Sequence, residues 1–500
     1  MGSLAGLQTG KGGQDRRAAV IGAGLGGLSA AIHLRLAGWR VTVSEAGQTT
    51  GGRANRLTLG GVRFDTGPTL LNYPWVFEEL FQAAGKDLRQ YLKLLPVDPS
   101  ITYRWPDGGH LTLSANLERL RAEFERLEPG AARGLDRFLA DAGEKFRITF
   151  HKLVPQNEEN PLRYFSALTV REILRTALWR SMHAELGRYF RSARIREALG
   201  SYAMYLGGSP FELPGLFTIL PYGELAQGLW LPEGGIYTLV EAVERLAREL
   251  GVEIHTGRRV RRILHRNGQV AGVRFDDGAE LGSPVVVSNA DLPQTLTELA
   301  GQPAPRLKMS PSVVTFYWAV KGRPGGLGHH TIFLPSDYAA AFRELNFGSS
   351  VPADPAFYVA APEASDPSLA QNGLTAVFAL VPVPLLRRLN GVNWKAETER
   401  LRETILRKLR DCGAGFAASC IQEEKAWTPV EWKQRFGLYD GSAFGAAHTL
   451  SQMGPFRPPN YSRRIRGLYF TGASTTPGTG LPMVVLSGKL TAQRIQSHVR

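Results

Sequence analysis

Three observations predict an α/β fold of two closely connected domains. Residues 16–46, RRAAVIGAGLGGLSAAIHLRLAGWRVTVSEA, are typical of a strand, a glycine-rich turn, a helix and a second strand. A second glycine-rich stretch, GGRANRLTLGGVRFDTGPT, follows at residues 51–69. Residues 465–495, near the other end, again show a strand, a Gly/Pro-rich loop and an apolar helix. A chain of 500 residues is also too long for one compact core.

The first segment has the pattern of a dinucleotide-binding, Rossmann-like unit. Residues 18–21 are apolar, as expected for a buried parallel strand. Gly22, Gly24 and Gly27 then form G-x-G-x-x-G. The first glycine permits the turn, the second lets the backbone approach a pyrophosphate, and the third lets helix and strand pack closely. Glu45 ends the second strand, about 20 residues past the glycines, where an acid can hydrogen-bond a ribose hydroxyl.

The second glycine-rich stretch helps to distinguish FAD from NAD. Gly51 and Gly52 would bring the backbone close to a ligand, and Arg53 can neutralise a diphosphate. The alternative is a surface hairpin whose arginine is only solvated. Because a simple NAD domain does not need this element, the stretch favours FAD.

The C-terminal segment predicts a second helix end that attracts anions. Residues 465–475 are typical of a strand, in which Leu468, Tyr469 and Phe470 lead into Gly472. Pro482 stands in the first turn of a helix from Leu481 to Val499, where proline is well tolerated. A helix N-terminus reached through small residues favours negative charge. We expect it to meet the charge that develops on a reduced flavin, so that both ends of the chain bind one FAD. The alternative is a terminal helix that only packs against the sheet.

Composition narrows the remaining classes of function. The net charge is +14, but no zinc finger, RNA-recognition signature or concentrated Lys/Arg tail indicates nucleic acid. An anionic membrane surface and a merely solvated basic surface both remain open. The longest apolar run, 374–386, contains two prolines and is too short to span a membrane, so it predicts a buried strand with a bent exit. Cys412 and Cys420 fit no metal motif or disulfide framework, so no metal is expected and the cytoplasm is the default location.

Residues 161–199 predict a helical segment that touches lipid. Eight arginines lie among only three acids in this segment. Apolar residues interleave with them: Leu168, Ile173, Leu174, Trp179, Met182, Leu186 and Phe190. A basic, aromatic and helical pattern is typical of a segment that dips into an anionic membrane surface. The alternative is an ordinary helical lid.

Across nearly the whole chain, from about Ala18 to Ile495, the sequence resembles the bacterial phytoene desaturases. These are the carotenoid desaturases of the FAD-binding, amine-oxidase-like superfamily. The resemblance rests on six stretches: VIGAGLGGLSAAIHL, GGRANRLTLGGVRFDTGPT, WLPEGGIYTLVEAV (230–243), HHTIFLPSDY (329–338), YDGSAFGAAHTLSQMGPFRP (439–458) and GASTTPGTGLPMVVLSGK (472–489). The first two are shared across the superfamily, and the last two are more particular to carotenoid desaturases.

The resemblance implies a discontinuous FAD-binding domain of the glutathione-reductase/amine-oxidase type with an inserted α+β substrate domain. We expect the FAD-binding domain at 16–100, 230–300 and 430–500, and the substrate and membrane-associating domain at 101–229 and 301–429. Residues 1–15 would be a flexible N-terminus. Segment 312–320 is strand-like enough to floor a substrate tunnel. The resemblance implies that Val260 offers its backbone to the adenine. The full set of expected FAD-binding residues is Gly22, Gly24, Gly27, Glu45, Gly52, Arg53, Val260, Gly472, Leu481, Pro482 and Met483.

The implied reaction is desaturation of an acyclic carotenoid, peripherally at the membrane. FAD would take a hydride while a proton leaves the neighbouring carbon, and oxygen or a quinone would reoxidise it. The substrate is phytoene-like, or a hydroxylated acyclic carotenoid that receives a 3,4 double bond. The alternatives are a carotenoid isomerase, a flavin amine oxidase on the same fold, or an escort protein for isoprenoids that is not an enzyme. No acid or base is assigned, since His329, His330 and His448 are lone histidines, which are more often structural.

Overall fold

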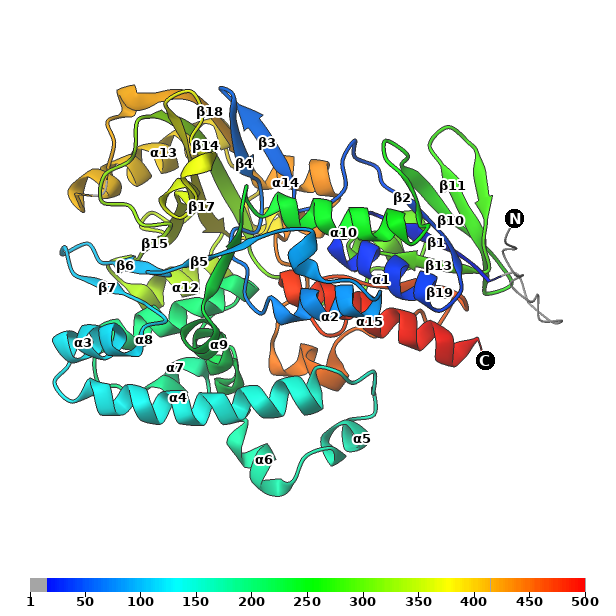
Figure 1. The fold of residues 1–500 in the computed structure, drawn as a ribbon, viewed down its shortest axis with the longest axis horizontal. Helices are drawn as coiled ribbons and strands as arrows, with labels where there is room; N and C mark the ends of the chain where they lie inside the picture. Colours follow the sequence, from blue (N-terminus) through cyan, green and yellow to red (C-terminus); the bar gives the residue numbers. More distant parts are fainter. Residues whose placement is uncertain (1–15, 414, 500) are drawn as a thin grey trace, which may run out of the picture.

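A parallel sheet of five strands brings the two ends of the chain together. The structure is a computed structural model and describes residues 16–413 and 415–499; the flexible N-terminus predicted for 1–15 lies outside the described residues. The strand order is β19-β13-β1-β2-β9 (right-hand side of Figure 1). The strands are β1 (Arg17–Ile21), β2 (Arg40–Ser44), β9 (Glu253–His255), β13 (Val285–Ser288) and β19 (Leu468–Phe470). Ala18 of β1 lies opposite Val41 and Val285, and Val286 lies opposite Leu468.

Two different layers cover the faces of this sheet. Ala18 and Val20 point to a layer of helices, whereas Ala19 and Ile21 point to a three-stranded antiparallel sheet. The helices are α1 (Leu25–Leu36), α2 (Trp75–Ala83), α10 (Tyr237–Glu249) and α15 (Leu481–His498). The antiparallel strands are β10 (Val260–Arg266), β11 (Gln269–Phe275) and β12 (Glu280–Gly282). Because both faces are buried, the parallel strands are apolar on both sides, and the predicted α/β fold is confirmed.

A mixed sheet of seven strands lies on the other side of the molecule (upper left of Figure 1), in the order β18-β14-β17-β16-β15-β6-β7. The strands are β6 (Thr102–Arg104), β7 (His110–Thr112), β14 (Ser312–Lys321), β15 (His330–Phe333), β16 (Phe357–Ala360), β17 (Leu374–Val383) and β18 (Ile421–Trp427). β14 and β17 pair along their full lengths, from Ser312 opposite Val383 to Lys321 opposite Leu374. Both strands were predicted from the sequence, and β17 ends directly before Pro384.

Helices cover this second sheet and extend from it. They are α3 (Leu117–Leu127), α4 (Ala131–Ile148), α5 (Pro161–Ser166), α6 (Val170–Arg175), α7 (Met182–Leu186), α8 (Ala193–Gly200), α9 (Ile219–Gln227), α12 (Tyr338–Phe347), α13 (Trp394–Asp411) and α14 (Pro429–Phe436). α5 and α6 project beyond α4 at the bottom of Figure 1. Among the described residues, no helix is both long and apolar enough to cross a bilayer.

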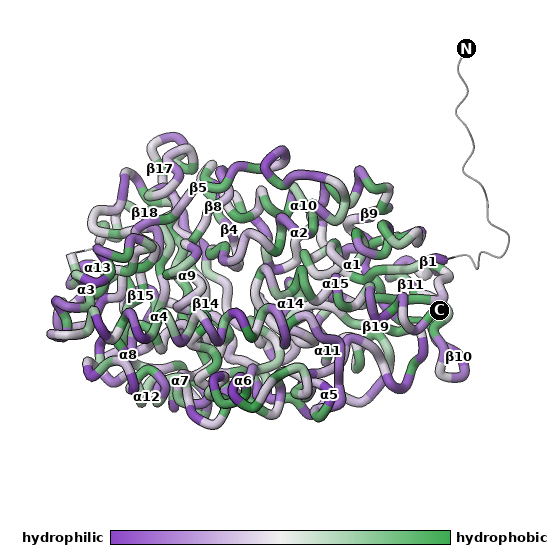
Figure 2. The backbone as a smooth tube through the Cα atoms, turned by 60° about the horizontal axis from the view of Figure 1, so that its bottom comes forward, coloured by the Kyte–Doolittle hydropathy of each residue, from purple (hydrophilic) through white to green (hydrophobic). Residues whose placement is uncertain are grey.

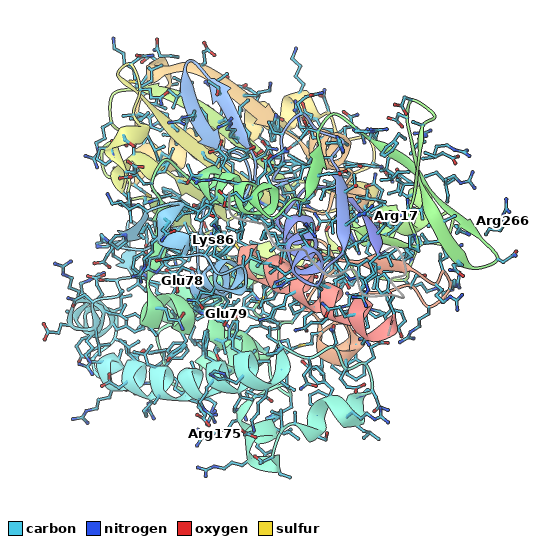
Figure 3. All side chains as sticks on the ribbon, turned by 45° about the vertical axis from the view of Figure 1, so that its right-hand side comes forward. Arg17, Glu78, Glu79, Lys86, Arg175 and Arg266 are labelled. Carbon is cyan, nitrogen blue, oxygen red and sulfur yellow. The ribbon has the colours of Figure 1, made fainter. Side chains whose placement is uncertain are left out.

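The basic segment 161–199 is only partly a surface element. Of the seven apolar residues that interleave with its arginines, Leu168, Met182, Leu186 and Phe190 are buried in the core, so these four do not face lipid. Leu174 and Trp179 are exposed. Several of the arginines are paired with acids; Arg175, labelled in Figure 3, reaches Asp141 on α4 at 3.4 Å, and Arg188 reaches Glu185 at 3.0 Å. The sequence correctly predicts helices in this segment, but it overestimates the apolar surface that they expose.

Two pairs of antiparallel strands form small sheets of their own. β3 (Arg56–Leu59) and β4 (Val62–Asp65) follow the second glycine-rich loop, yet Val62 and Phe64 pack against β14 and β17 of the seven-stranded sheet. Asp65 at the end of β4 accepts hydrogen bonds from the N–H groups of Ile236 (2.7 Å) and Tyr237 (2.9 Å) at the start of α10. β5 (Leu94–Val97) pairs with β8 (Leu229–Pro232). The chain thus crosses between the two sheets beside the first glycine turn.

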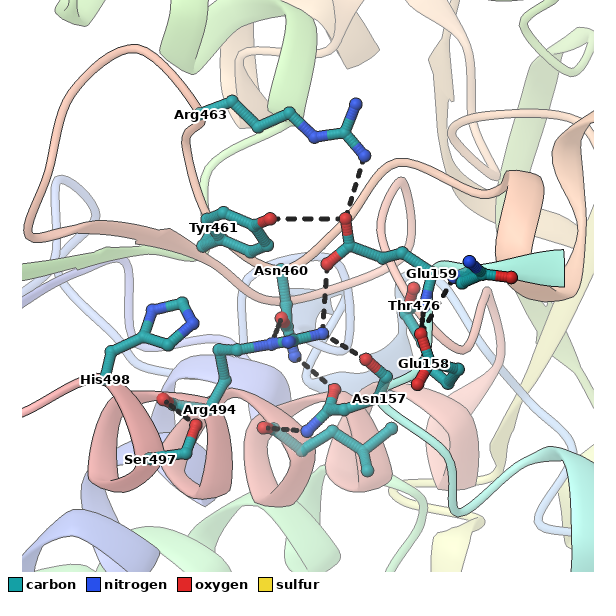
Figure 4. Close-up of polar contacts among 12 residues, drawn as sticks. Asn157, Glu158, Glu159, Asn460, Tyr461, Arg463, Thr476, Arg494, Ser497 and His498 are labelled. Carbon is teal, nitrogen blue, oxygen red and sulfur yellow. Dashed lines mark hydrogen bonds and ion pairs between the residues drawn. The ribbon is translucent and has the colours of Figure 1, made fainter. Parts of the chain in front are cut away.

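A polar cluster fixes the linker after α4 to the last helix (Figure 4). Glu159 accepts from Arg463 at 2.8 Å and from Arg494 of α15 at 3.1 Å. Asn157 donates to the carbonyl of Leu490 at 2.8 Å and accepts from Asn460 at 2.8 Å. The linker between α4 and α5 is therefore held against α15 and the segment before it.

Candidate active site

A cavity of about 560 Å³ lies where the two sheets meet. One part of its wall comes from the ends of the chain: the first glycine turn, the 51–54 loop and residues 471–484. The other part is mostly apolar and comes from the seven-stranded sheet and the helices beside it. Its residues include Met204, Leu206, Phe217, Leu220, Ile332, Phe357, Phe378, Leu380 and Pro382.

Ten of the eleven residues predicted from the sequence to contact a cofactor line this cavity. They are Gly22, Gly24, Glu45, Gly52, Arg53, Val260, Gly472, Leu481, Pro482 and Met483. Gly27 lies behind them in α1, where a Cβ would stand 2.1 Å from the carbonyl oxygen of Gly22. Its predicted role, close packing of helix on strand, agrees with that distance.

Glu45 is oriented by the first turn. One carboxylate oxygen accepts from the N–H of Ala23 at 2.8 Å, and the other accepts from Gly47 at 2.7 Å. Gly22 in the same turn has φ +89°, a conformation that glycine adopts without strain. The carboxylate thus stands at the carboxyl end of β2, beside the turn, where the sequence predicts contact with a ribose.

The 51–53 loop lies alongside this turn. The N–H of Gly51 donates to the carbonyl of Ala23 at 2.9 Å, and a Cβ on Gly52 would be 3.4 Å from the Cα of Gly24. Arg53 donates to the carbonyl of Ala443 at 2.6 Å, so it is not the freely solvated arginine of a surface hairpin. Burial lowers the pKa of Arg53, and the negative charge of Asp291 raises it.

Asn289, which sequence reasoning missed, lies where the two ends of the chain meet. A Cβ on Gly24 would be 2.7 Å from its Nδ2, and a Cβ on Gly26 or Gly472 would be 2.7 or 3.0 Å from its Oδ1. The backbone of Asn289 donates to Ile21 at 2.8 Å. The available signal was its position directly after the buried strand 285–288, because ligands of such sheets bind at the carboxyl ends of the strands.

Arg457 organises the C-terminal loop from within the protein. Its buried guanidinium donates to main-chain carbonyls, among them Thr475 (2.9 Å), Ala473 (2.5 Å) and Ala446 (3.1 Å). Burial lowers its pKa to about 9, a measure of the cost of placing a cation there. The sequence alone predicts no role for this arginine, which lies in the stretch GPFRP.

The start of α15 opens onto the cavity. The first-turn residues Leu481–Val484 line it, and the N–H groups of a first turn have no partner within the helix. The preceding loop is held by Ser487 of α15, which accepts from the N–H of Gly472 at 3.0 Å. The N-terminus of α15 therefore faces the same cavity as the first glycine turn, and its role as a second anion site stays a prediction.

The three histidines differ in their surroundings. His330 is bonded to the hydroxyl of Tyr358, a cavity-lining residue, at 2.6 Å, and it stacks on His329 at 3.9 Å. His448 lines the cavity and accepts weakly from the N–H of Thr479 at 3.4 Å. Burial lowers the pKa of all three, so they are neutral near pH 7.

The model of the flavin-containing amine oxidoreductase family matches residues 25–496. The chain belongs to this family. Within it, the curated relatives include the zeta-carotene-forming phytoene desaturase of Myxococcus xanthus, 38% identical, covering 97% of this chain and 94% of the relative. The all-trans-zeta-carotene desaturase of the same organism is 35% identical, covering 96% and 93%. Among solved structures, a putrescine oxidase bound to putrescine matches with a TM-score of 0.63 at 18% identity, over 96% of this chain and 99% of that one, which shows the fold.

The residues present fit the FAD of a flavin oxidoreductase. Gly24, Gly26 and Gly472 leave open a cradle around Asn289 that side chains would fill. Glu45, Arg53 and two helix N-termini supply the donors and acceptors that an adenine dinucleotide requires. This oxidoreductase therefore combines a cofactor cradle with an attached apolar chamber.

Proposed function

We propose that this flavin oxidoreductase is a carotenoid desaturase, which introduces C–C double bonds into an acyclic carotenoid. The observation that carries the proposal is one cavity whose cofactor-side wall continues into an apolar wall built on β15, β16 and β17. A long polyene carries no charge that polar side chains could bind, so it needs an apolar chamber of this kind. The names of the relatives, which cover nearly the whole chain, support the same substrate class.

In this proposal the eleven predicted residues hold FAD, and the domains follow the predicted boundaries. Gly22, Gly24 and Gly52 provide close approach, and Glu45 binds a ribose hydroxyl. Arg53 faces the diphosphate, Val260 the adenine, and Gly472 with Leu481–Met483 the flavin end. Segments 16–100, 230–300 and 430–500 form the FAD-binding domain, although the hairpin at 56–65 packs on the other sheet.

The protein contributes alignment, exclusion of water and electrostatics to the reaction. When bound, the flavin supplies a two-electron acceptor for a hydride. The first turn of α15 stabilises negative charge at this end of the cavity. Apolar residues such as Leu220, Phe378 and Leu380 hold the polyene in place and keep water out. Oxygen or a membrane quinone is the final electron acceptor in this proposal.

Membrane association is the second part of the proposal. The projecting helices α5 and α6 and the turn after them expose Leu162 (83%), Val170 (74%), Leu174 (60%) and Trp179 (54%). Figure 2 shows hydrophilic and hydrophobic residues side by side around α5 and α6. Arg163 and Arg171 flank these apolar side chains, which is the composition of an interfacial anchor. A carotenoid would enter from the bilayer at this side.

The test is incubation of FAD-loaded protein with phytoene in liposomes, followed by separation and mass measurement of the products. Loss of two hydrogens per new double bond, with a longer-wavelength absorption, supports desaturation. A product of unchanged mass would make the enzyme an isomerase. Turnover of primary amines or polyamines, with no change in the carotenoid, would make it an amine oxidase.

A further inference from the structure

The proposed reaction releases one proton with each hydride, so a proton acceptor is needed in a cavity wall that excludes water. Among the described residues of the wall, the acids are Glu45 and Asp291, and the histidine is His448. Both oxygens of Glu45 accept from main-chain N–H groups, and Asp291 accepts from the hydroxyl of Ser474 at 2.7 Å and from a main-chain N–H at 3.0 Å. His448 accepts from the N–H of Thr479 at 3.4 Å, and its other ring nitrogen is buried. Donors within the protein therefore already occupy these three groups.

Tyr358 connects the apolar part of the wall to a further histidine. It is half-buried and lines the cavity. Its hydroxyl lies 2.6 Å from Nδ1 of His330 and 2.6 Å from the hydroxyl of Thr69, which also lines the cavity. The strand register explains this contact: Ile332 of β15 lies opposite Tyr358 of β16, and His330, two residues before Ile332, is on the same face of the sheet. His330 thus lies behind Tyr358 and reaches the cavity through it.

The other tyrosines of the described cavity wall have no such connection. The hydroxyl of Tyr164 donates to the carbonyl of Leu153 at 3.1 Å, and a main-chain carbonyl is not a base near neutral pH. The hydroxyl oxygens of Tyr73 and Tyr205 have no surface open to the cavity. The wall therefore offers one tyrosine that is hydrogen-bonded to a side chain able to take up a proton.

We infer that Tyr358 is the catalytic residue that receives the proton of the substrate, and that His330 is the positioning residue that takes up the tyrosine proton in the same step. This inference rests on the proposed function and supplies the acid–base group that the sequence does not identify. One C–H bond of the polyene breaks with its electron pair, which leaves as hydride to the flavin. The neighbouring C–H bond breaks, its electron pair forms the new C=C bond, and its proton goes to the oxygen of Tyr358. The original O–H proton of Tyr358 moves to Nδ1 of His330, so the tyrosine remains neutral.

The surroundings of both groups fit these roles. Burial and, next, the nearby His329 lower the pKa of His330 well below its ordinary value, so the imidazole is neutral and its lone pair is free to accept. Burial raises the pKa of Tyr358, which prevents the phenol from acting alone as a phenolate base. The hydride adds one negative charge on one side of the cavity and the proton adds one positive charge on the other. Because both charges stay within a water-poor space, they stabilise each other.

The kinetic test follows the rate of flavin reduction by phytoene in liposomes, without oxygen or quinone. Tyr358→Phe should lower the rate constant about 100-fold or more, the usual contribution of general acid–base catalysis. Its affinity for the carotenoid, measured by quenching of tryptophan fluorescence, should not change, because a hydrocarbon makes no hydrogen bond to the hydroxyl. His330→Asn should lower the rate similarly, since asparagine can still accept from Tyr358 but cannot take up a proton.

Tyr317→Phe is the matched control. Tyr317 lies in the same sheet but is not part of the cavity wall, and its buried hydroxyl donates to the carbonyl of Thr66 at 2.8 Å. Its loss should leave the rate of flavin reduction unchanged. FAD content and thermal melting show that each variant is folded. A wild-type rate in Tyr358→Phe overturns the inference, and a wild-type rate in His330→Asn does so too, because His330 would then only hold the tyrosine in place.

A second measurement does not depend on turnover. Nitrogen NMR of protein with ¹⁵N-labelled histidine, with and without FAD, reports which ring nitrogen of His330 carries hydrogen. The inference predicts an unprotonated Nδ1 near neutral pH, with a resonance that shifts in Tyr358→Phe and is absent in His330→Asn. A hydrogen on Nδ1 overturns the inference even if the wild type converts carotenoids. Wild-type protein that binds FAD and phytoene but never reduces the flavin contradicts the proposed function itself.

Discussion

Arg457→Met should detach the C-terminal loop from the rest of the site. The wild-type guanidinium donates to five carbonyls, and four of these bonds are 3.1 Å or shorter. Methionine fills similar space but leaves those buried carbonyls without a donor, at about 1 kcal/mol each. Removal of a buried cation returns part of this energy. We therefore expect a net loss of about 2–4 kcal/mol, concentrated in residues 446–476, which include the loop before α15.

Two measurements separate local from global effects of this substitution. Urea unfolding followed by circular dichroism reports the loss of stability, and flavin fluorescence during heating reports the release of FAD. The expected result is FAD release well below the temperature at which the secondary structure melts. Arg457→Lys, which retains the charge but has fewer donors, should give an intermediate effect. Unchanged FAD affinity and stability in Arg457→Met would refute the role assigned to this arginine.

Four further results are expected. Gly27→Ala places a Cβ 2.1 Å from the carbonyl oxygen of Gly22. It should lower the free energy of unfolding by about 1–3 kcal/mol and weaken FAD binding, as measured by thermal melting and FAD titration. Wild-type behaviour would contradict the close packing of α1 on β1. Burial raises the pKa of Glu224 to about 7, so its contribution to stability is complete below about pH 4.5 and is lost as the pH rises through about 7. In urea unfolding, the free energy of unfolding of Glu224→Gln should therefore rise relative to the wild type by up to about 3 kcal/mol between pH 5 and 8. A difference that does not change with pH would contradict the burial of this carboxyl. Lys145→Met leaves Glu185, whose side chain is fully buried, without its 2.7 Å partner and should cost about 3 kcal/mol, whereas a neutral effect would show that Arg180 and Arg188 suffice. The triple variant Leu162→Ser, Leu174→Ser, Trp179→Ser should lose co-sedimentation with anionic liposomes at low salt and keep its FAD, and undiminished sedimentation would remove α5 and α6 as the anchor.

Local patterns predict residues that line one wall of the cavity, because each part of that wall has a signature in the sequence. The glycine turn, Glu45 and the loop before α15 all require particular residues at particular spacing. Asn289 and Arg457 have no such signature, since their roles arise from segments that meet only after folding. Asn289 lies against Gly24 and Gly26, which are 265 and 263 positions earlier, and against Gly472, which is 183 positions later. Arg457 bonds to two separate loops.

Burial was harder to predict than secondary structure. The apolar residues of 161–199 were expected to face lipid, but Met182, Leu186 and Phe190 pack against α3, α4 and α8. Helical periodicity shows that a face is apolar and does not show what covers it. For the same reason the burial of Glu224 of α9 among Tyr73, Tyr103 and Tyr202 was not foreseen, because these residues come from separate elements and are ordinary in their local contexts.

The most direct test of the central claim, one cavity shared by FAD and a polyene, is a single-turnover reaction without oxygen or quinone. FAD-loaded protein is mixed with an excess of an acyclic carotenoid, and the absorption of flavin and carotenoid is followed together. The account predicts that oxidised-flavin absorbance disappears as longer-wavelength polyene absorbance appears, with one new double bond per flavin. Protein that takes up no FAD, or flavin that stays oxidised while bound carotenoid remains unchanged, would contradict it.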